Sequence, residues 1–170
     1  MAQWIAASSD HMGMQGLIID TKAANVHVFD SASRLLASIP VLLGSARGDD
    51  SVPDIGSRPI ADVQPEERKT PSGRFIAEQG RNLNGEDVLW VDYDNAVSMH
   101  RVRASNPLKP RLERFATPAI ADDRISYGCI NVPIPFWETH IRPIFANHRA
   151  VVYVLPEVKT VQQVFAGSAG

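Results

Sequence analysis

The sequence has one cysteine, no long apolar run and no excess of charge of either sign. The single cysteine, Cys129, excludes an internal disulfide and any zinc site that needs several cysteines. No run approaches the roughly 20 apolar residues of a membrane-spanning helix, so we expect no transmembrane segment. A net charge of −2 gives no electrostatic reason to expect nucleic acid as a partner. The 170 residues are enough for one buried core.

The two ends of the chain have little patterning. The first residues, MAQWIAASSDHMGMQG, lack the basic and apolar regions of a signal peptide, so none is visible in this chain. We expect residues 1–16 to be a flexible N-terminal segment and residues 17–156 to be the folded domain. Residues 157–170 are expected to be a C-terminal tail that ends in FAGSAG.

Between the ends, most of the chain has the periodicity of β-strands. Pro40 suggests an edge or a bend in the third apolar run, and the spacing in IPFWETHIRPIFANH predicts one helix bent at Pro143. The predicted fold class is therefore mainly β, with one principal helix after the cysteine. The predicted strands cover 17–20, 25–30, 34–44, a stretch from 74, 88–93, 96–102 and 150–157.

Two irregular stretches, 45–69 and 104–124, are rich in turn-forming and polar residues. Long irregular stretches are uncommon in a small β-rich domain unless they build a site. The second leads directly into RISYGCINVP, which contains Cys129. Gly128 permits a turn and leaves room for a substrate carbonyl, and amides of that turn are candidate oxyanion donors. The residue pattern alone fits a packing cysteine as well as a nucleophile.

A nucleophilic cysteine needs a base or a cation beside it. His100 ends a predicted strand and opens the stretch that returns to Cys129, so it is the candidate partner. Ser126 and Asn131 flank the turn and can hold it by side-chain hydrogen bonds. The other histidines are interpreted as mobile, solvated or capping residues: His11, His27, His140 and His148.

Three separated motifs resemble the L,D-transpeptidases, the YkuD-type enzymes that cross-link peptidoglycan. HRVRAS followed by RISYGCINVP is similar to the catalytic signature of the family, and KTPSGRF is similar to its Thr-Pro-x-Gly-x-Phe strand entry. The similarity runs in the right order from Leu17 to Leu155. The matching signature positions are His100, Ser126, Gly128, Cys129, Ile130 and Asn131.

Two departures from the family pattern concern the site. Tyr127 stands where the family has a second histidine that lines the site, so it is a candidate substrate contact. The 29 positions from His100 to Cys129 (129 − 100) exceed the commonest family spacing, so 104–124 resembles an insertion over the site. Its arginines are candidate contacts for a substrate carboxylate: Arg111, Arg114 and Arg124.

The resemblance implies a single-domain L,D-transpeptidase-like β-sandwich and acyl transfer on peptidoglycan stem peptides without a metal or organic cofactor. Cys129 would be the nucleophile, His100 the general acid and base, and the carbonyl of Arg101 would orient His100. Gly128 would form the oxyanion turn, with Ser126, Tyr127 and Asn131 near the substrate. It also implies acylation by carbapenems and a periplasmic or exported location. A hydrolase with the same machinery and a non-catalytic wall-binding module remain alternatives.

Overall fold

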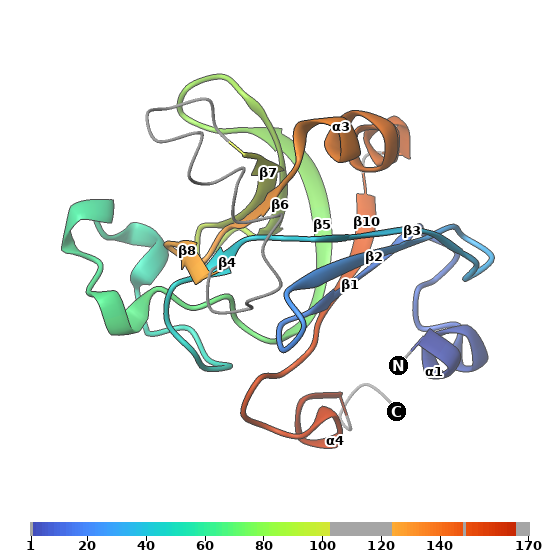
Figure 1. Ribbon diagram of the computed structural model, residues 1–170, viewed down its shortest axis with the longest axis horizontal. Helices are drawn as coiled ribbons and strands as arrows, with labels where there is room; N and C mark the ends of the chain where they lie inside the picture. The colour runs from blue at the N-terminus through green and yellow to red at the C-terminus, as the bar shows by residue number, and fades with distance from the viewer. Residues whose placement is uncertain (1, 103–123, 148, 166–170) are drawn as a thin grey trace.

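The computed structural model describes residues 2–102, 124–147 and 149–165. One eight-stranded mixed sheet dominates it, in the order β3-β2-β1-β10-β5-β6-β7-β9, beside a small parallel pair, β4-β8. Strands β1 to β3 run across the view of Figure 1 and β5 lies at a steep angle to them, so the sheet is strongly curved. The strands are β1 Gly16–Asp20, β2 Asn25–Phe29, β3 Leu35–Pro40, β4 Leu43–Gly44, β5 Gly73–Arg81, β6 Asp87–Asp92, β7 Val97–Arg101, β8 Arg124–Ser126, β9 Ile130–Val132 and β10 Arg149–Val154.

The central strands β1 and β10 are buried on both faces of the sheet. Leu17 and Ile19 face the main core, whereas Ile18 faces a second cluster with Val151 and Tyr153. Successive side chains of a strand point to opposite faces, so a nearly continuous apolar run is what a strand covered on both sides requires. The closing strand predicted from AVVYVLPE is therefore present and buried.

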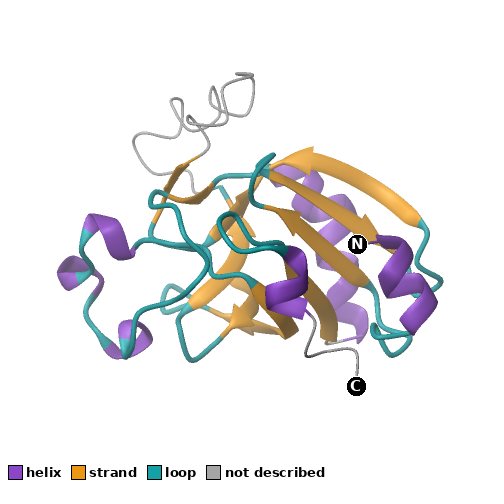
Figure 2. Cartoon of the chain, turned by 90° about the horizontal axis from the view of Figure 1, so that it is seen from below, coloured by secondary structure: helices purple, strands orange, loops and turns teal. Residues whose placement is uncertain are grey.

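The predicted helix after the cysteine is a continuous helical segment of changing pitch. It comprises α3 Ile134–Phe136, the π-helical η5 Trp137–Ile141 and the 3-10 helix η6 Arg142–Asn147. Pro143 lies where the pitch tightens, consistent with its missing N–H. Trp137, Ile141 and Ile144 are fully buried in the main core. The mainly β fold class with one principal helix after Cys129 is confirmed (Figure 2).

The remaining predicted elements differ in detail. The run 34–44 is two strands: β3 forms the sheet edge and ends at Pro40, whereas β4 leaves to pair with β8. The long irregular stretch 45–69 contains three short 3-10 helices: η1 Ile55–Ser57, η2 Ile60–Asp62 and η3 Pro65–Glu67. In Figure 1 these lie together at one side of the molecule.

Both ends of the described chain pack against the second face of the sheet, which differs from the expected flexible segment and tail. Helix α1 Ala2–Ser8 buries Ile5, and α4 Val161–Phe165 buries Phe165 near the ring of Tyr153. Asp10 accepts hydrogen bonds from Arg74 and from the hydroxyl of Tyr153. These segments cover apolar surface of β1 and β10 that water would otherwise reach.

Candidate active site

The parallel pairing of β7 with β9 brings the cysteine to the histidine. In this register Met99 lies opposite Ile130 and His100 lies opposite Asn131. Cys129 directly precedes β9, so the same register sets it beside Ser98. Residues 29 positions apart in the sequence (129 − 100) thus occupy neighbouring strands of one sheet.

The thiol of Cys129 is partly buried between backbone and side chains of β7 and the residue before it. Its Sγ lies 3.6 Å from the Oγ of Ser98 and 3.7 Å from the carbonyl oxygen of Ala96. The sequence reasoning missed Ser98. The signal for it was the strand period of two, which sets Ser98 on the same face of β7 as His100.

His100 is held by the backbone. Its Nδ1 lies 2.7 Å from the carbonyl oxygen of Arg101, the carbonyl named from the sequence. A carbonyl can only accept, so Nδ1 carries the proton in this contact and Nε2 is the nitrogen able to exchange a proton. Asp92, at the end of β6, does not orient His100 but accepts hydrogen bonds from the backbone and side chain of Asn95.

The surroundings of Cys129 favour its thiolate. Burial raises the pKa of the thiol, but the hydrogen bond and the positive charge of His100 lower it, as do the contacts with Ser98. The net result is a pKa below the ordinary value of 9.0. A lowered pKa is what distinguishes a reactive cysteine from a buried packing residue.

Ser126 and Asn131 hold the cysteine turn from inside. The hydroxyl of Ser126 donates to the carbonyl of Cys129 at 2.6 Å and accepts from the N–H of Gly128 at 3.1 Å. The side-chain amide of Asn131 donates to the same carbonyl at 3.3 Å. Both residues are buried, so these bonds fit a turn-holding role, and their predicted contact with substrate stays a prediction.

Gly128 is required by both the conformation and the space at the turn. Its φ of +125° is one that residues with a side chain rarely adopt, and an added Cβ would lie 2.6 Å from the carbonyl oxygen of Lys69. Thr70, at the start of the TPSGRF motif, donates to the carbonyl of Gly128 at 2.9 Å. The strand-entry motif therefore lies directly against the cysteine turn.

Tyr127 lies at the surface, two residues before Cys129 in the sequence. Its side chain is 43% exposed, and the guanidinium of Arg68 lies 4.0 Å from the centre of its ring. Arg68 comes from the end of the stretch 45–69, so that irregular stretch reaches the turn, as its length led us to expect. The sequence reasoning had not singled out Arg68.

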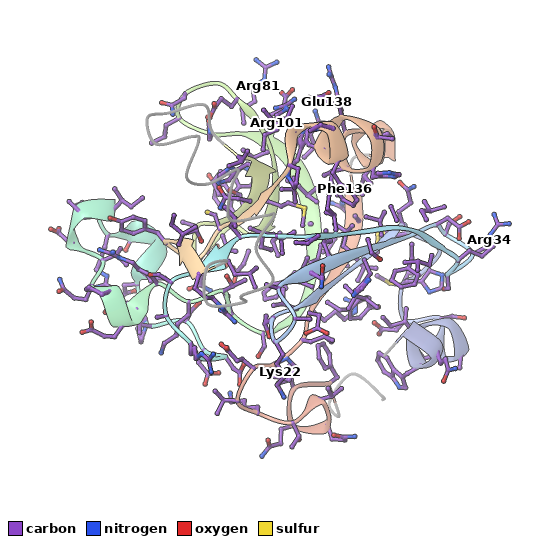
Figure 3. All side chains as sticks on the ribbon, viewed as in Figure 1. Lys22, Arg34, Arg81, Arg101, Phe136 and Glu138 are labelled. Atoms are coloured by element: carbon purple, nitrogen blue, oxygen red, sulfur yellow. The ribbon has the colours of Figure 1, made fainter. Side chains whose placement is uncertain are left out.

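Beyond its carbonyl, Arg101 links the site to the helical segment. Its guanidinium is 2.7 Å from the carboxylate of Glu138 and 5.1 Å from the ring of Trp137. Glu138 also pairs with Arg142 at 2.8 Å. Figure 3 shows Arg101 and Glu138 close together at the same end of the molecule. These contacts fix the strand end that carries the His100-orienting carbonyl.

The structure describes only one of the three arginines predicted to contact a substrate carboxylate. Arg124 is only 9% exposed and donates to the carboxylate of Glu157 at 2.9 Å and to the carbonyl of Thr21 at 2.8 Å. Its predicted contact with a substrate carboxylate stays a prediction, and these contacts argue against it. Arg111, Arg114 and positions 104–123 of the proposed insertion 104–124 lie outside the described residues.

The remaining described histidines lie in other surroundings. The ring of His11 contacts the carbonyl of Ser31, His27 bonds Ser38, and the ring of His140 lies tilted against that of Phe136, with centroids 4.8 Å apart. In the part of the chain that the structure describes, no cluster of three or more His, Cys, Asp or Glu side chains could hold a metal ion. Nor does any helix there have the length and apolarity to cross a membrane.

No protein-family model and no curated protein matches the sequence. Solved structures do match. The helical cell shape determining protein Pgp2 from Campylobacter jejuni is 16% identical, with 86% of this chain and 48% of that chain covered, at a TM-score of 0.51. An L,D-transpeptidase in complex with imipenem is 16% identical over 83% of this chain and 58% of its own, at 0.48. An L,D-transpeptidase from Mycobacterium smegmatis is 14% identical over 82% and 58%, at 0.47.

At such identities the similarity concerns the fold alone. The match to Pgp2 shows that this curved, mainly β fold also occurs in a cell shape determining protein. This chain spans about half the length of the solved structures that it matches, 48% to 58% of those named above. What this chain does must therefore be argued from its own site.

Proposed function

We propose that the protein is a cysteine acyltransferase of the L,D-transpeptidase type that acts on peptidoglycan stem peptides. The observation that carries this proposal is the contact set of Cys129, whose thiol pKa is lowered by His100 and Ser98. The motif resemblance supplies the substrate class, and Pgp2, a cell shape determining protein, shares the fold.

In the first step, the Cys129 thiolate attacks the amide carbonyl after the L-centre of the diamino acid in a tetrapeptide stem. A carbon–sulfur bond forms, and the carbon–nitrogen bond to the terminal D-amino acid breaks. His100, as imidazolium, donates its Nε2 proton to the leaving amine. The result is a thioester on Cys129 and a neutral His100.

In the second step, an incoming amine attacks the thioester while neutral His100 takes its proton. The new amide leaves, and the thiolate returns beside an imidazolium. The N–H of Gly128 donates to Ser126, so we assign the N–H of Cys129 as an oxyanion donor. The carbonyl of Arg101 contributes by binding Nδ1 of His100, which leaves Nε2 as the nitrogen that donates and accepts the proton.

The test is incubation of the protein with purified muropeptides and, separately, with a carbapenem, followed by mass spectrometry of protein and products. We expect a covalent adduct on Cys129 and none on Cys129→Ala. The proposal fails if the two proteins behave identically, with neither adduct nor product. Cys129→Ser is a second variant that keeps the size of the side chain.

The same experiment separates transfer from hydrolysis. With a donor stem peptide and no added amine, a hydrolase releases the terminal amino acid and leaves a shortened stem. With an amine acceptor, a transpeptidase gives the new amide at the expense of that product. Formation of the new amide supports the proposal, whereas hydrolysis alone under both conditions favours an L,D-carboxypeptidase or another peptidoglycan hydrolase.

A further inference from the structure

Arg68 differs from the other arginines in the described residues in having no ion pair. The nine others each contact a carboxylate: Arg34, Arg47, Arg58, Arg74, Arg81, Arg101, Arg124, Arg142 and Arg149. A cation without a counter-ion attracts an anionic group, and it does so most strongly where it is partly shielded from water. Arg68 is partly buried.

The carboxylate next to Arg68 in the sequence is already occupied. Glu67 accepts from Arg58 at 3.1 Å and from the backbone N–H of Gln64 at 2.9 Å. Arg68 instead donates from Nε and one terminal nitrogen to the carbonyl oxygen of Val63, at 3.3 and 3.1 Å. This neutral acceptor fixes the guanidinium in place and leaves its positive charge uncompensated.

The guanidinium is fixed beside the cysteine turn. It lies over the ring of Tyr127, and Tyr127 is two residues before Cys129. The backbone that follows Arg68 abuts the same turn, since the carbonyl of Lys69 fills the space beside Gly128. The N–H of Ala46 donates to the carbonyl of Arg68 at 3.0 Å, which secures the other side. The positively charged guanidinium of Arg68 is therefore held in place against the turn that carries the proposed nucleophile, Cys129.

We propose that Arg68, stacked on Tyr127, binds a carboxylate of the acyl donor next to the reacting carbonyl. A guanidinium suits this task because its planar fork matches the two oxygens of a carboxylate while its face stacks on an aromatic ring. A peptide spans about 3.3 Å per residue, so a carboxylate one or two residues from the reacting carbonyl matches the two-residue separation of Tyr127 from Cys129. The inference rests on the proposed function for the nature of the donor, but not for the anion site itself.

The first test uses two small alkylating agents that are similar in size but differ in charge. Iodoacetate carries a carboxylate and iodoacetamide is neutral, and with both the Cys129 thiolate forms a carbon–sulfur bond and iodide leaves. We expect Arg68→Gln to slow iodoacetate roughly fivefold while leaving the iodoacetamide rate nearly unchanged. Any attraction by His100 is common to both proteins, so the ratio of the two rates isolates Arg68.

Arg34→Gln is the matched control, because it removes one positive charge at the far edge of the sheet, away from the site (Figure 3). Tyr127→Phe keeps the stacked ring and should keep the rate ratio, whereas Tyr127→Leu removes the ring and should lower it. An unchanged ratio in Arg68→Gln overturns the proposal. An equal fall with both reagents also overturns it, since Arg68 would then only support the turn.

The second test compares a stem-peptide donor with its carboxyl-amidated form. We expect the wild type to prefer the free carboxylate through a lower KM, and Arg68→Gln to lose that preference. If neither donor reacts but the alkylation ratio still depends on Arg68, the proposed function fails and the anion site stands. If the donors react with a preference that Arg68→Gln leaves intact, the anion site fails and the acyl transfer stands.

Discussion

The hydroxyl of Thr70 donates to the carbonyl of Gly128 at 2.9 Å and accepts from the N–H of Gly44 at 2.9 Å. One buried side chain thus joins the cysteine turn to strand β4, which itself pairs with β8 on the other side of the turn. In the sequence, the TPSGRF motif shows only a resemblance to the family's strand entry. Its threonine fixes the backbone that presents Cys129.

Replacing this threonine tests the link between the motif and the thiol. Thr70→Val keeps the shape but leaves the N–H of Gly44 and the carbonyl of Gly128 without their partner, at a cost of about 1–3 kcal/mol. We expect lower stability in urea unfolding together with slower alkylation of Cys129 in the folded protein. Thr21→Val is the control, since it removes a buried hydroxyl that bonds only the carbonyl of Leu155. Equal thiol reactivity in Thr70→Val and wild type would contradict the assignment.

The lowered pKa of Cys129 gives a second prediction, in the pH dependence of alkylation. Because the thiolate is the reacting form, the rate of iodoacetamide alkylation should reach half its maximum below pH 9.0. In His100→Ala the burial remains and the favourable hydrogen bond and charge are lost, so this midpoint should move to higher pH. His27→Ala, on β2 and bonded to Ser38 of the edge strand β3, should leave it in place. A midpoint that does not differ between His100→Ala and wild type would rule out a dyad.

How far the sequence predicts the fold can be seen at particular elements. The alternation around Val26 and Val28 is local information, and β2 forms where it predicts a strand. The division of 34–44 depends on long-range pairing, because Leu42 bridges Asn131 and β4 joins β8. Helices α1 and α4 were missed since each supplies few buried side chains, and those are buried only where they meet the second face of β1 and β10.

The candidate site divides in the same way. His100 and Cys129 are candidates in the sequence because a histidine at a strand end and a Gly-Cys pair lie within motifs that resemble the L,D-transpeptidase signature. Ser98 and Arg68 are ordinary residues in the sequence, and their importance comes from the register of β7 with β9 and from the contact with Tyr127. Neither relationship can be derived from spacing along one chain.

Ser98 should support the thiolate directly. Its Oγ is 3.6 Å from Sγ, and its contacts lower the thiol pKa alongside those of His100. A hydrogen bond to a charged group contributes about 1.5–3 kcal/mol, so Ser98→Ala should slow acylation roughly tenfold or more at neutral pH. The midpoint of the alkylation profile should rise, by less than in His100→Ala. Ser38→Ala is the control, and an unaltered profile in Ser98→Ala would show that the contact carries no energy.

Because there is no space for a side chain at Gly128, we expect an alanine substitution there to be more costly than one at Gly85. Gly128 has a φ of +125° and Gly85 a φ of +77°, but only at Gly128 would an added Cβ meet backbone, 2.6 Å from the Lys69 carbonyl. Gly85→Ala should therefore cost about 1 kcal/mol for conformation alone. Gly128→Ala should cost more and also abolish acylation, because the turn must shift. Urea unfolding and the carbapenem adduct measure the two effects, and equal costs for both variants would refute this account of the turn.

A buried carboxylate makes the stability of the protein sensitive to acid. Asp49 accepts hydrogen bonds from the backbone N–H groups of Glu157, Val158 and Lys159, at 2.6, 3.0 and 2.5 Å. These bonds tie the segment before α4 to the loop after β4, where Asp49 lies. Burial raises the pKa of this carboxyl, but the three hydrogen bonds lower it below the ordinary 3.8. A carboxyl whose folded pKa is depressed stabilises the fold fully above the unfolded value and loses that contribution as the pH falls through the folded value.

We therefore expect the free energy of unfolding to be steady near neutral pH and to decline below about pH 4. Asp49→Asn cannot accept all three N–H groups, so at pH 7 it should be less stable by about 1–3 kcal/mol. The free energy of unfolding of Asp49→Asn should decline less steeply in acid than that of the wild type, because the variant has no carboxylate at this position to protonate. Asp50→Asn is the matched control, as it removes an equal charge from an exposed ion pair with Lys159. Urea unfolding of the three proteins between pH 3 and pH 7 measures this, and parallel curves for Asp49→Asn and wild type would contradict the role assigned to Asp49.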